Sequence, residues 1–151
     1  MDDRVADVAA AVESAAESLL SVLDAQAPAV PPAQLRVLTI VASNRHTNMS
    51  RLAETLEVVP SSASRLCDRL EANGLLRRVP DPRDRREVRL MMTPAAQRLL
   101  DELRSRRRRA LATVLERMPA AVRQELVHSL TAFAEATDPD RDDAGEDLRT
   151  A

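Results

Sequence analysis

Residues 49–93 of this 151-residue chain read MSRLAETLEVVPSSASRLCDRLEANGLLRRVPDPRDRREVRLMMT in one-letter code. Apolar side chains recur at helical spacing over residues 49–56, and Asn48 before them is a suitable N-cap, so a short helix is expected there. A second helix is expected to begin at Pro60, because proline is favoured at the first helical position. It should stop before Gly74, which can adopt a positive φ. The pattern predicts two successive helices joined by a short turn.

A β-hairpin is expected directly after these two helices. The sequence predicts strands over residues 76–79 and 87–92, with Val88, Leu90 and Met92 on one face of the second strand. The turn between them is rich in Pro, Asp and Arg, which are common turn and loop-tip residues. This combination is typical of a helix-turn-helix followed by a β wing.

Helical patterns flank this segment on both sides. Helices are expected over residues 3–26 and about 33–41, and a helix of some 25 residues should open with Thr93 as its cap and Pro94 at its first position. A last helix should begin after Pro119. Its inward side is expected to carry Val122, Leu126, Leu130 and Phe133. The fold class predicted is therefore mainly α with a small two-stranded β wing.

Charge is unevenly distributed along the chain, although the formal net charge is only −2. Between Ser61 and Arg109, fourteen arginines stand against seven acidic residues, which gives this segment a charge of +7. The acidic residues lie mainly towards the two ends, and residues 138–151 are acidic and polar enough to predict disorder. A basic middle with acidic flanks favours contact with a phosphate backbone.

The remaining composition excludes several classes of protein. One cysteine cannot form an intramolecular disulfide, and this cysteine with two scattered histidines lacks the spacing of a metal site. No Ser-His-Asp, paired-carboxylate or Gly-rich phosphate motif occurs in a suitable context, so neither an enzyme nor a bound cofactor is expected. The acidic N-terminus is unlike a signal peptide, and no apolar run reaches the ~18 residues of a membrane span. We expect a cytoplasmic protein without a membrane partner.

The second predicted helix has two chemically different sides. Its apolar side carries Ala63, Leu66, Cys67 and Leu70. Its other side carries Ser61, Ser62, Arg65, Asp68 and Arg69. Short hydroxyl side chains allow a helix N-terminus to enter the major groove of double-stranded DNA, and arginine can bind guanine through two hydrogen bonds. The outward side therefore predicts a DNA-reading surface.

The hairpin tip adds a second predicted contact with DNA. Arg83, Arg85 and Arg86 lie at the tip, and a narrow minor groove attracts arginine. Asp84 lies among them and is not a phosphate ligand. We expect Asp84 to pair with a neighbouring arginine and to fix the shape of the tip.

Several fragments together carry a resemblance to a known family. They are Leu52-Ala53-Glu54, Pro60 to Arg65, Asp68 to Glu71, Gly74 to Arg78, Asp81 to Arg86, Thr93-Pro94 and, upstream, Pro32 to Leu38. As a set, from about Pro31 to Leu100, they resemble the MarR (multiple antibiotic resistance regulator) family. The resemblance implies a homodimer with interlocking N- and C-terminal helices that bears two winged domains on a pseudo-palindrome. Residues 1–30 and 94–137 would form the helical dimerisation region, and residues 31–93 the winged helix-turn-helix DNA-binding region.

The resemblance also assigns roles to individual residues. By position in the motifs, the recognition-helix role falls to Ser61, Ser62, Ser64 and Arg65. Arg86 takes the role of the wing-tip arginine in the minor groove, with Asp84 as its partner carboxylate. The chain departs from the family pattern at Glu57, where a glycine is usual, and at Val59, where a capping Ser or Thr is usual. Ala96 replaces a glycine that commonly follows Thr-Pro. The departures at Glu57 and Val59 could tilt the recognition helix or weaken its cap by ~1 kcal/mol.

Other interpretations of the same residues remain open. The serines could be ordinary helix-start residues and Arg86 an ordinary surface residue, while Cys67 is expected to be a buried structural thiol rather than a redox sensor. The run Arg106–Arg109 could form a solvated face, ion pairs across a dimer or phosphate contacts. His46 and His128 carry no pattern of metal binding or catalysis.

The function predicted is a sequence-specific transcriptional regulator of the repressor type, and the alternative is a protein-interaction module that uses the same fold. The resemblance implies release from DNA by a small phenolic or anionic ligand. Because the chain has no Tyr or Trp and Phe133 is its one aromatic residue, an aliphatic pocket or no ligand at all remains open. The operator, the regulated genes and the sign of regulation do not follow from the sequence.

Overall fold

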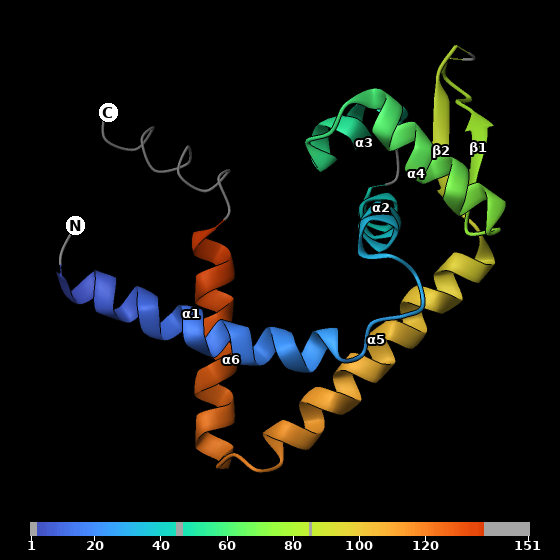
Figure 1. Ribbon diagram of the computed structural model, residues 1–151. Helices are drawn as coiled ribbons and strands as arrows, with labels where there is room; N and C mark the ends of the chain where they lie inside the picture. The colour runs from blue at the N-terminus through green and yellow to red at the C-terminus, as the bar shows by residue number, and fades with distance from the viewer. Residues whose placement is uncertain (1–2, 45–46, 85, 138–151) are drawn as a thin grey trace, which may run out of the picture. The chain divides into compact units, whose positions relative to one another are not determined.

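The computed structural model describes residues 3–44, 47–84 and 86–137 (Figure 1). Its elements in chain order are α1 (Asp3–Asp24), α2 (Pro32–Ser43), α3 (Met49–Leu56), α4 (Pro60–Ala72), β1 (Leu76–Pro80), β2 (Val88–Met92), α5 (Pro94–Leu115) and α6 (Ala120–Ala136). The chain divides into two compact units, Met1–Ala110 and Leu111–Ala151. Within the described ranges, no helix combines the length and the apolar content needed to cross a membrane.

Helices α3 and α4 form the predicted helix-turn-helix. The Asn48 side chain accepts a 2.9 Å hydrogen bond from the backbone N–H of Arg51, which confirms Asn48 as the N-cap of α3. Pro60 is the first residue of α4, and Gly74 follows the helix with a φ of 67°. The expected boundaries of both helices are therefore confirmed. The sequence could predict them because caps, proline and glycine act locally.

The wing is an antiparallel pair whose register runs from Leu76 opposite Met92 to Pro80 opposite Val88. β1 is one residue longer than expected, and β2 begins one residue later. A short segment before α3 pairs with β2 as well: Leu90 N–H donates a 2.9 Å hydrogen bond to the Thr47 carbonyl, and Asn48 forms a β-bridge with Arg89. The sequence pattern did not predict this pairing, because two residues are too few to show a strand periodicity.

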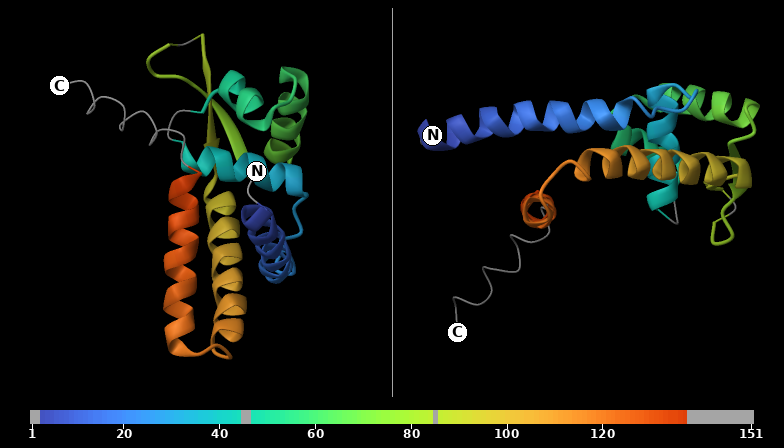
Figure 2. Two further views of the ribbon diagram at one scale, coloured as in Figure 1. Left: turned by 90° about the vertical axis from the view of Figure 1, so that its left-hand side faces the viewer. Right: turned by 90° about the horizontal axis from the view of Figure 1, so that it is seen from below.

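The core of the first unit lies where α2, α3, α4 and the hairpin meet. The largest fully buried side chains are Leu38, Leu52, Leu70, Val37 and Cys67. The expected cap of α5 is confirmed, because the Thr93 hydroxyl accepts a 3.2 Å hydrogen bond from the Ala96 N–H. In the left view of Figure 2 the hairpin tip extends beyond α3 and α4, so the core holds the hairpin at its base and leaves the tip exposed.

The last helix differs from expectation. No residue of α6 is buried, Phe133 is 60% exposed, and Val122 and Leu130 are also exposed, while Leu126 is half-buried. The prediction that these four residues lie inside is wrong for the single chain. Helical periodicity identifies the residues that share one side of a helix, but it does not identify what covers that side. α5 ends at Leu115, and its 22 residues make it slightly shorter than the helix expected there.

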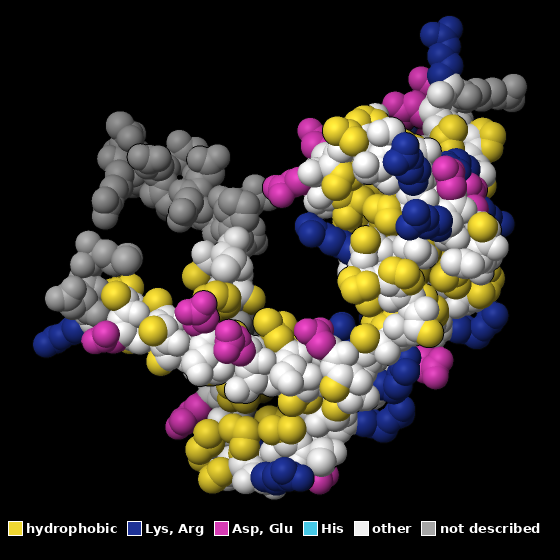
Figure 3. Space-filling view, viewed as in Figure 1, with side chains coloured by type: hydrophobic (Ala, Val, Ile, Leu, Met, Phe, Trp, Pro, Cys, Tyr) yellow, Lys and Arg dark blue, Asp and Glu magenta, His cyan; other side chains and the backbone are white. Residues whose placement is uncertain are grey.

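Helix α1 also exposes its apolar residues. Val8 is 61% exposed, and Val5, Val12 and Leu20 are exposed as well. Figure 3 shows hydrophobic side chains on the visible faces of α1 and α6. Each of these two helices therefore carries an apolar side with little cover from its own chain.

Candidate nucleic-acid interface

Helix α4 separates an inner side from an outer side as predicted. Ala63, Cys67 and Leu70 are fully buried against the core, and Leu66 is half-buried. On the outer side Ser61, Arg65, Asp68 and Arg69 are exposed, while Ser62 is half-buried. These apolar residues fix the orientation of α4 relative to the core. The outer side of its first turn presents hydroxyl groups, and the following turns present guanidinium groups.

The turn before α4 contains the residue that departs from the family pattern. Glu57 ends α3 with a φ of 55°, the one positive φ of a non-glycine residue in the described ranges. Its N–H donates to the carbonyls of Ala53 and Glu54, so the turn closes as a left-handed helix end. A side chain in this region stores roughly 1–3 kcal/mol of strain. The turn therefore forms with glutamate at this position, and the backbone strain lowers the stability of the fold.

Val59 is the second departure from the family pattern. It precedes α4 in an extended conformation and supplies no capping hydrogen bond from its side chain. Backbone contacts substitute in part, because the Ser62 N–H donates a 2.9 Å hydrogen bond to the Val59 carbonyl. The amide groups of the first turn are also placed to meet an anion at the helix N-terminus.

The hairpin tip is shaped by two aspartates. Asp81 accepts a 2.7 Å hydrogen bond from the Arg83 N–H, and Asp84 accepts a 2.9 Å bond from the Arg86 N–H. The Arg83 and Arg86 side chains are exposed, and Arg85 lies outside the described residues. Among the described residues, Asp84 thus contacts a neighbouring arginine through the backbone N–H of Arg86. These two backbone contacts hold the tip with Arg83 and Arg86 exposed to solvent.

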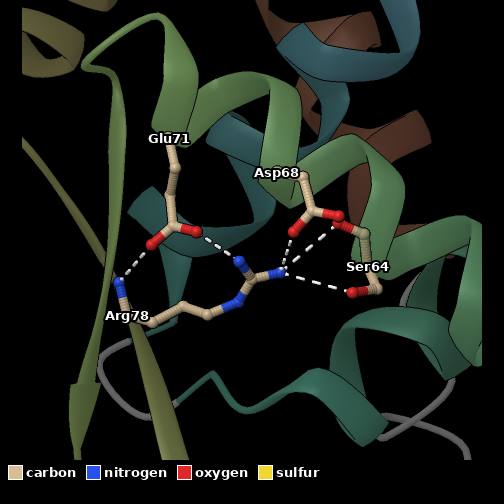
Figure 4. Close-up of polar contacts among 4 residues, drawn as sticks. All are labelled: Ser64, Asp68, Glu71 and Arg78. Atoms are coloured by element: carbon tan, nitrogen blue, oxygen red, sulfur yellow. Dashed lines mark hydrogen bonds and ion pairs between the residues drawn. The ribbon is translucent and has the colours of Figure 1, made fainter.

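An ion-pair network joins α4 to the hairpin (Figure 4). Arg78 of β1 lies with its Nη2 atom 2.9 Å from Asp68 Oδ1, and its Nη1 atom contacts Glu71 Oε2. Nη2 also lies 3.3 Å from the Ser64 carbonyl and 3.4 Å from the Ser64 hydroxyl. Ser64 is half-buried, so its hydroxyl is directed to Arg78 in this structure. The role of Ser64 in DNA contact stays a prediction.

Sequence reasoning missed this network and placed Asp68 only on the outer side of α4. The signal was present, because Ser64, Asp68 and Glu71 follow one another at i, i+4 and i+7 on one helical stripe. Partial burial disfavours the Arg78 charge, but the hydrogen bond to Asp68 and the nearby carboxylates outweigh it and raise the pKa of Arg78 above its ordinary value. Arg78 therefore stays charged within the network.

The base of the hairpin carries further polar contacts. Asn48 Nδ2 donates a 3.3 Å hydrogen bond to Glu87 Oε2, and Arg89 Nε lies 4.0 Å from Asp81 Oδ2. Figure 3 shows basic side chains distributed over the part of the molecule that contains α3, α4 and the hairpin. Asp68, Glu71 and Asp81 are thus engaged by arginines of the same chain. Arg65 and Arg69 of α4 and Arg83 and Arg86 of the tip are exposed.

Comparison with known proteins agrees with this geometry. Residues 30–88 match the MarR family. The chain is 30% identical over 111 residues to the HTH-type transcriptional repressor MdtR of Bacillus subtilis. The matched stretch covers 74% of this chain and 72% of the relative. The chain belongs to the MarR family. Members of the MarR family are DNA-binding transcription factors rather than enzymes, and this chain is a MarR-family transcriptional regulator.

Solved structures show the same MarR architecture. The crystal structure of RV1404 from Mycobacterium tuberculosis superposes with a TM-score of 0.77 at 30% identity and covers 90% of this chain and 95% of that one. A MarR family protein from Bacillus stearothermophilus gives a TM-score of 0.75 at 24% identity, with 90% and 97% of the two chains covered. The predicted winged helix-turn-helix fold is confirmed.

Other residues singled out in this MarR-family chain lie as follows. Burial raises the pKa of the Cys67 thiol to about 11 from an ordinary 9.0, and the thiol is inaccessible, as expected for a structural cysteine. Arg107 Nε donates a 3.4 Å hydrogen bond to the Leu23 carbonyl, while Arg108 is exposed. His128 is exposed, and His46 lies outside the described residues.

A groove of about 540 Å3 lies between the end of α2, the two strands and the start of α5. Its lining includes the apolar side chains of Val41, Leu90, Met91 and Met92 and the basic residues Arg77 and Arg89. No aromatic side chain lines this groove, in agreement with the near absence of aromatic residues from the sequence.

Proposed function

We propose that this MarR-family regulator acts as a homodimeric repressor that reads a pseudo-palindromic site in double-stranded DNA. The observation that carries the proposal is the row of exposed side chains Ser61, Arg65 and Arg69 on α4, beside a hairpin that exposes Arg83 and Arg86 at its tip. Both surfaces belong to one compact unit and are joined by the Arg78 network. A major-groove helix and a minor-groove tip are the two contacts that such an arrangement can make at once.

In the proposed complex the two surfaces have different tasks. The recognition set comprises Ser61, Ser62, Ser64, Arg65 and Arg69. Arg65 and Arg69 can bond base edges, and the serine hydroxyls can bond bases or phosphate. The wing set comprises Arg83, Arg85 and Arg86, with Asp84 shaping the tip. These arginines add minor-groove affinity, and the phosphate contacts set the register of the protein on the duplex.

The homodimer is proposed because of the uncovered apolar sides of α1 and α6. Phe133 and Leu130 of α6 and Val8 of α1 are each at least 45% exposed. Contiguous apolar surfaces of this kind mark protein–protein interfaces more often than free surface. A second copy of the chain would bury them and set the distance between the two reading helices.

We further propose that the protein represses transcription and that a small ligand releases it from DNA. The relative MdtR is named a repressor, and we extend that sign of regulation to this chain. The groove lined by Met91, Met92 and Arg77 adjoins both the wing and the start of α5. A ligand bound there more tightly in one arrangement of the dimer would shift the population towards that arrangement.

Footprinting on the intergenic DNA next to the gene, followed by gel-shift titrations, tests the proposal. We expect protection of two half-sites about 10 base pairs apart, or a multiple of that spacing. Arg65→Ala should weaken binding by ~1–3 kcal/mol and relax sequence preference. Arg117→Ala removes an exposed arginine from the other unit and serves as the control. Absence of specific binding would favour the alternative of a protein-interaction module.

A further inference from the structure

Arg78 occupies a central position between the recognition helix and the wing. It lies in the middle of β1, opposite Leu90 of β2, and its guanidinium group contacts residues from three successive turns of α4. The Glu71 carboxylate binds both ends of the same residue, because Oε1 accepts a 2.9 Å hydrogen bond from the Arg78 backbone N–H while Oε2 contacts Nη1. Strand and helix are thus joined through main chain and side chain together.

The network differs from an ordinary surface ion pair in its environment. The side chains of Arg78 and Glu71 are only 26% and 31% exposed, whereas Asp68 is 59% exposed on the outer side of α4. A planar guanidinium group holding two carboxylates and a carbonyl permits one relative orientation of the two elements. Apolar packing at the hairpin base does not impose that restriction, because dispersion contacts are not directional.

We infer that Arg78 is a positioning residue that fixes the angle between α4 and the hairpin, so that Arg86 reaches the minor groove only when α4 is seated in the major groove. The inference rests on the proposed function, since it concerns how the two DNA contacts are coupled. Loss of the contacts between the Arg78 guanidinium group and α4 would leave α4 and the hairpin folded but free to change their relative angle. The wing would then contribute little to affinity even with all its arginines present.

The same contacts have an electrostatic consequence that must be separated from positioning. Arg78 compensates Asp68 and Glu71, two carboxylates beside the reading side. Removing Arg78 alone would leave both carboxylates to repel phosphate and would weaken binding uniformly. A double variant, Glu71→Gln with Arg78→Met, keeps the net charge unchanged and still removes the guanidinium contacts with α4.

The test is a double-mutant cycle on DNA affinity in the full-length protein, using the footprinted site as the probe. In the wild-type background Arg86→Ala should weaken binding about tenfold, as for one good groove contact. In the Glu71→Gln/Arg78→Met background the same substitution should change affinity less than about twofold, because the wing is already misplaced. Arg98→Met removes an exposed charge from the start of α5, outside the Arg78 network and the groove, and is the control, in which the tenfold effect of Arg86→Ala should persist.

Hydroxyl-radical footprints and unfolding curves complete the test. The charge-balanced variant should lose minor-groove protection at the wing position and keep protection at the α4 position. Should it fail to fold, Arg78→Lys replaces it, because lysine keeps the charge and cannot bind both carboxylates as a planar fork. Equal effects of Arg86→Ala in all backgrounds would overturn the inference and leave the proposed function intact. Absence of specific binding by the wild type would instead overturn the proposed function.

Discussion

The Thr93 hydroxyl donates a 2.7 Å hydrogen bond to the carbonyl oxygen of Gly74, so the start of α5 is fastened to the turn that ends α4. The Thr93 N–H also donates a 3.2 Å bond to the Leu75 carbonyl. One residue therefore caps α5 and holds the end of α4 at the base of the hairpin. Movement of α5 would be transmitted directly to α4 through this point.

Thr93→Val should destabilise the fold by ~1–2 kcal/mol, because valine has a similar shape but supplies neither the cap to Ala96 nor the bond to Gly74. The free energy of unfolding is measured by urea titration. Thr55→Val is the control, since Thr55 is exposed and its hydroxyl bonds to the Arg51 carbonyl within the same helix α3. A loss in the control equal to that of Thr93→Val would contradict the assigned role.

Glu57→Gly should stabilise the protein by about 1 kcal/mol. Glycine adopts the φ of 55° without the strain that glutamate carries, and this gain exceeds the larger entropy that glycine has in the unfolded chain. The thermal midpoint and urea titration both measure the change. Glu54→Gly, three residues earlier inside α3, should destabilise by ~1 kcal/mol and so gives the opposite sign. A destabilising Glu57→Gly would show that the left-handed end is not a site of strain.

Stability should fall with pH in a window set by Cys67. Its folded-state pKa of about 11 lies above the ordinary 9.0, so the neutral thiol is favoured in the folded state. The corresponding stability is intact below pH 9 and is lost as the pH rises towards 11. The chain contains no lysine and no tyrosine. Cys67 therefore has the one side chain whose ordinary pKa lies close to this window.

Urea titrations between pH 8.5 and 11 measure this dependence, and the expected loss is on the order of 2 kcal/mol. Cys67→Ala should be less stable at neutral pH because of the cavity it leaves, but its stability should not change across the window. A thiol reagent should react with the native protein only as fast as it unfolds. A slope that persists in Cys67→Ala would assign the effect to another group.

The local elements could be predicted from the sequence, and the reasons are physical. Asn48 as a cap, Pro60 as a first residue and Gly74 as a positive-φ stop each act over one helical turn, so short-range pattern is enough to locate them. The two sides of α4 follow from its periodicity together with the need to bury its apolar residues. The outward position of Arg65 and Arg69 is predictable for the same reason.

Several contacts that escaped prediction join residues that are distant in sequence. Arg78 meets Ser64 across fourteen positions, and Asn48 meets Glu87 across thirty-nine. The Asn48–Glu87 pairing leaves no periodic signal, and the helical stripe of Ser64, Asp68 and Glu71 does not identify its partner on β1. The exposure of Phe133 has a different origin, because a monomer sequence shows which side of α6 is apolar but not whether its cover comes from the same chain.

The exposed apolar side of α6 should prove necessary for the proposed dimer. Leu130→Asp combined with Phe133→Asp places two charges on that side, and burying an unpaired charge at an interface is strongly unfavourable. Sedimentation equilibrium should show a monomer for this variant and a dimer for the wild type. Gln124→Asp adds a charge at an exposed polar position of the same helix and should leave the dimer intact. A dimeric double variant would exclude this side of α6 from the interface.

The shape of the wing tip and its charge can be varied separately at Asp84. Asp84 is exposed, and its Oδ1 atom accepts the Arg86 N–H, a contact that an amide oxygen can reproduce and a methyl group cannot. Asp84→Asn should therefore keep the tip conformation and bind DNA at least as tightly as the wild type, because a negative charge near phosphate is removed. Asp84→Ala removes the same charge but should lose affinity several-fold, roughly the effect of a misplaced arginine contact.

Gel-shift titrations at two salt concentrations measure the comparison. The two variants carry the same charge, so any difference in affinity between them reports the conformation of the tip rather than long-range repulsion. Unfolding free energies should agree within about 0.5 kcal/mol, since the substitution is at the surface. Equal affinities for Asp84→Ala and Asp84→Asn would mean that the hydrogen bond to Arg86 does not hold the wing arginine in its binding position.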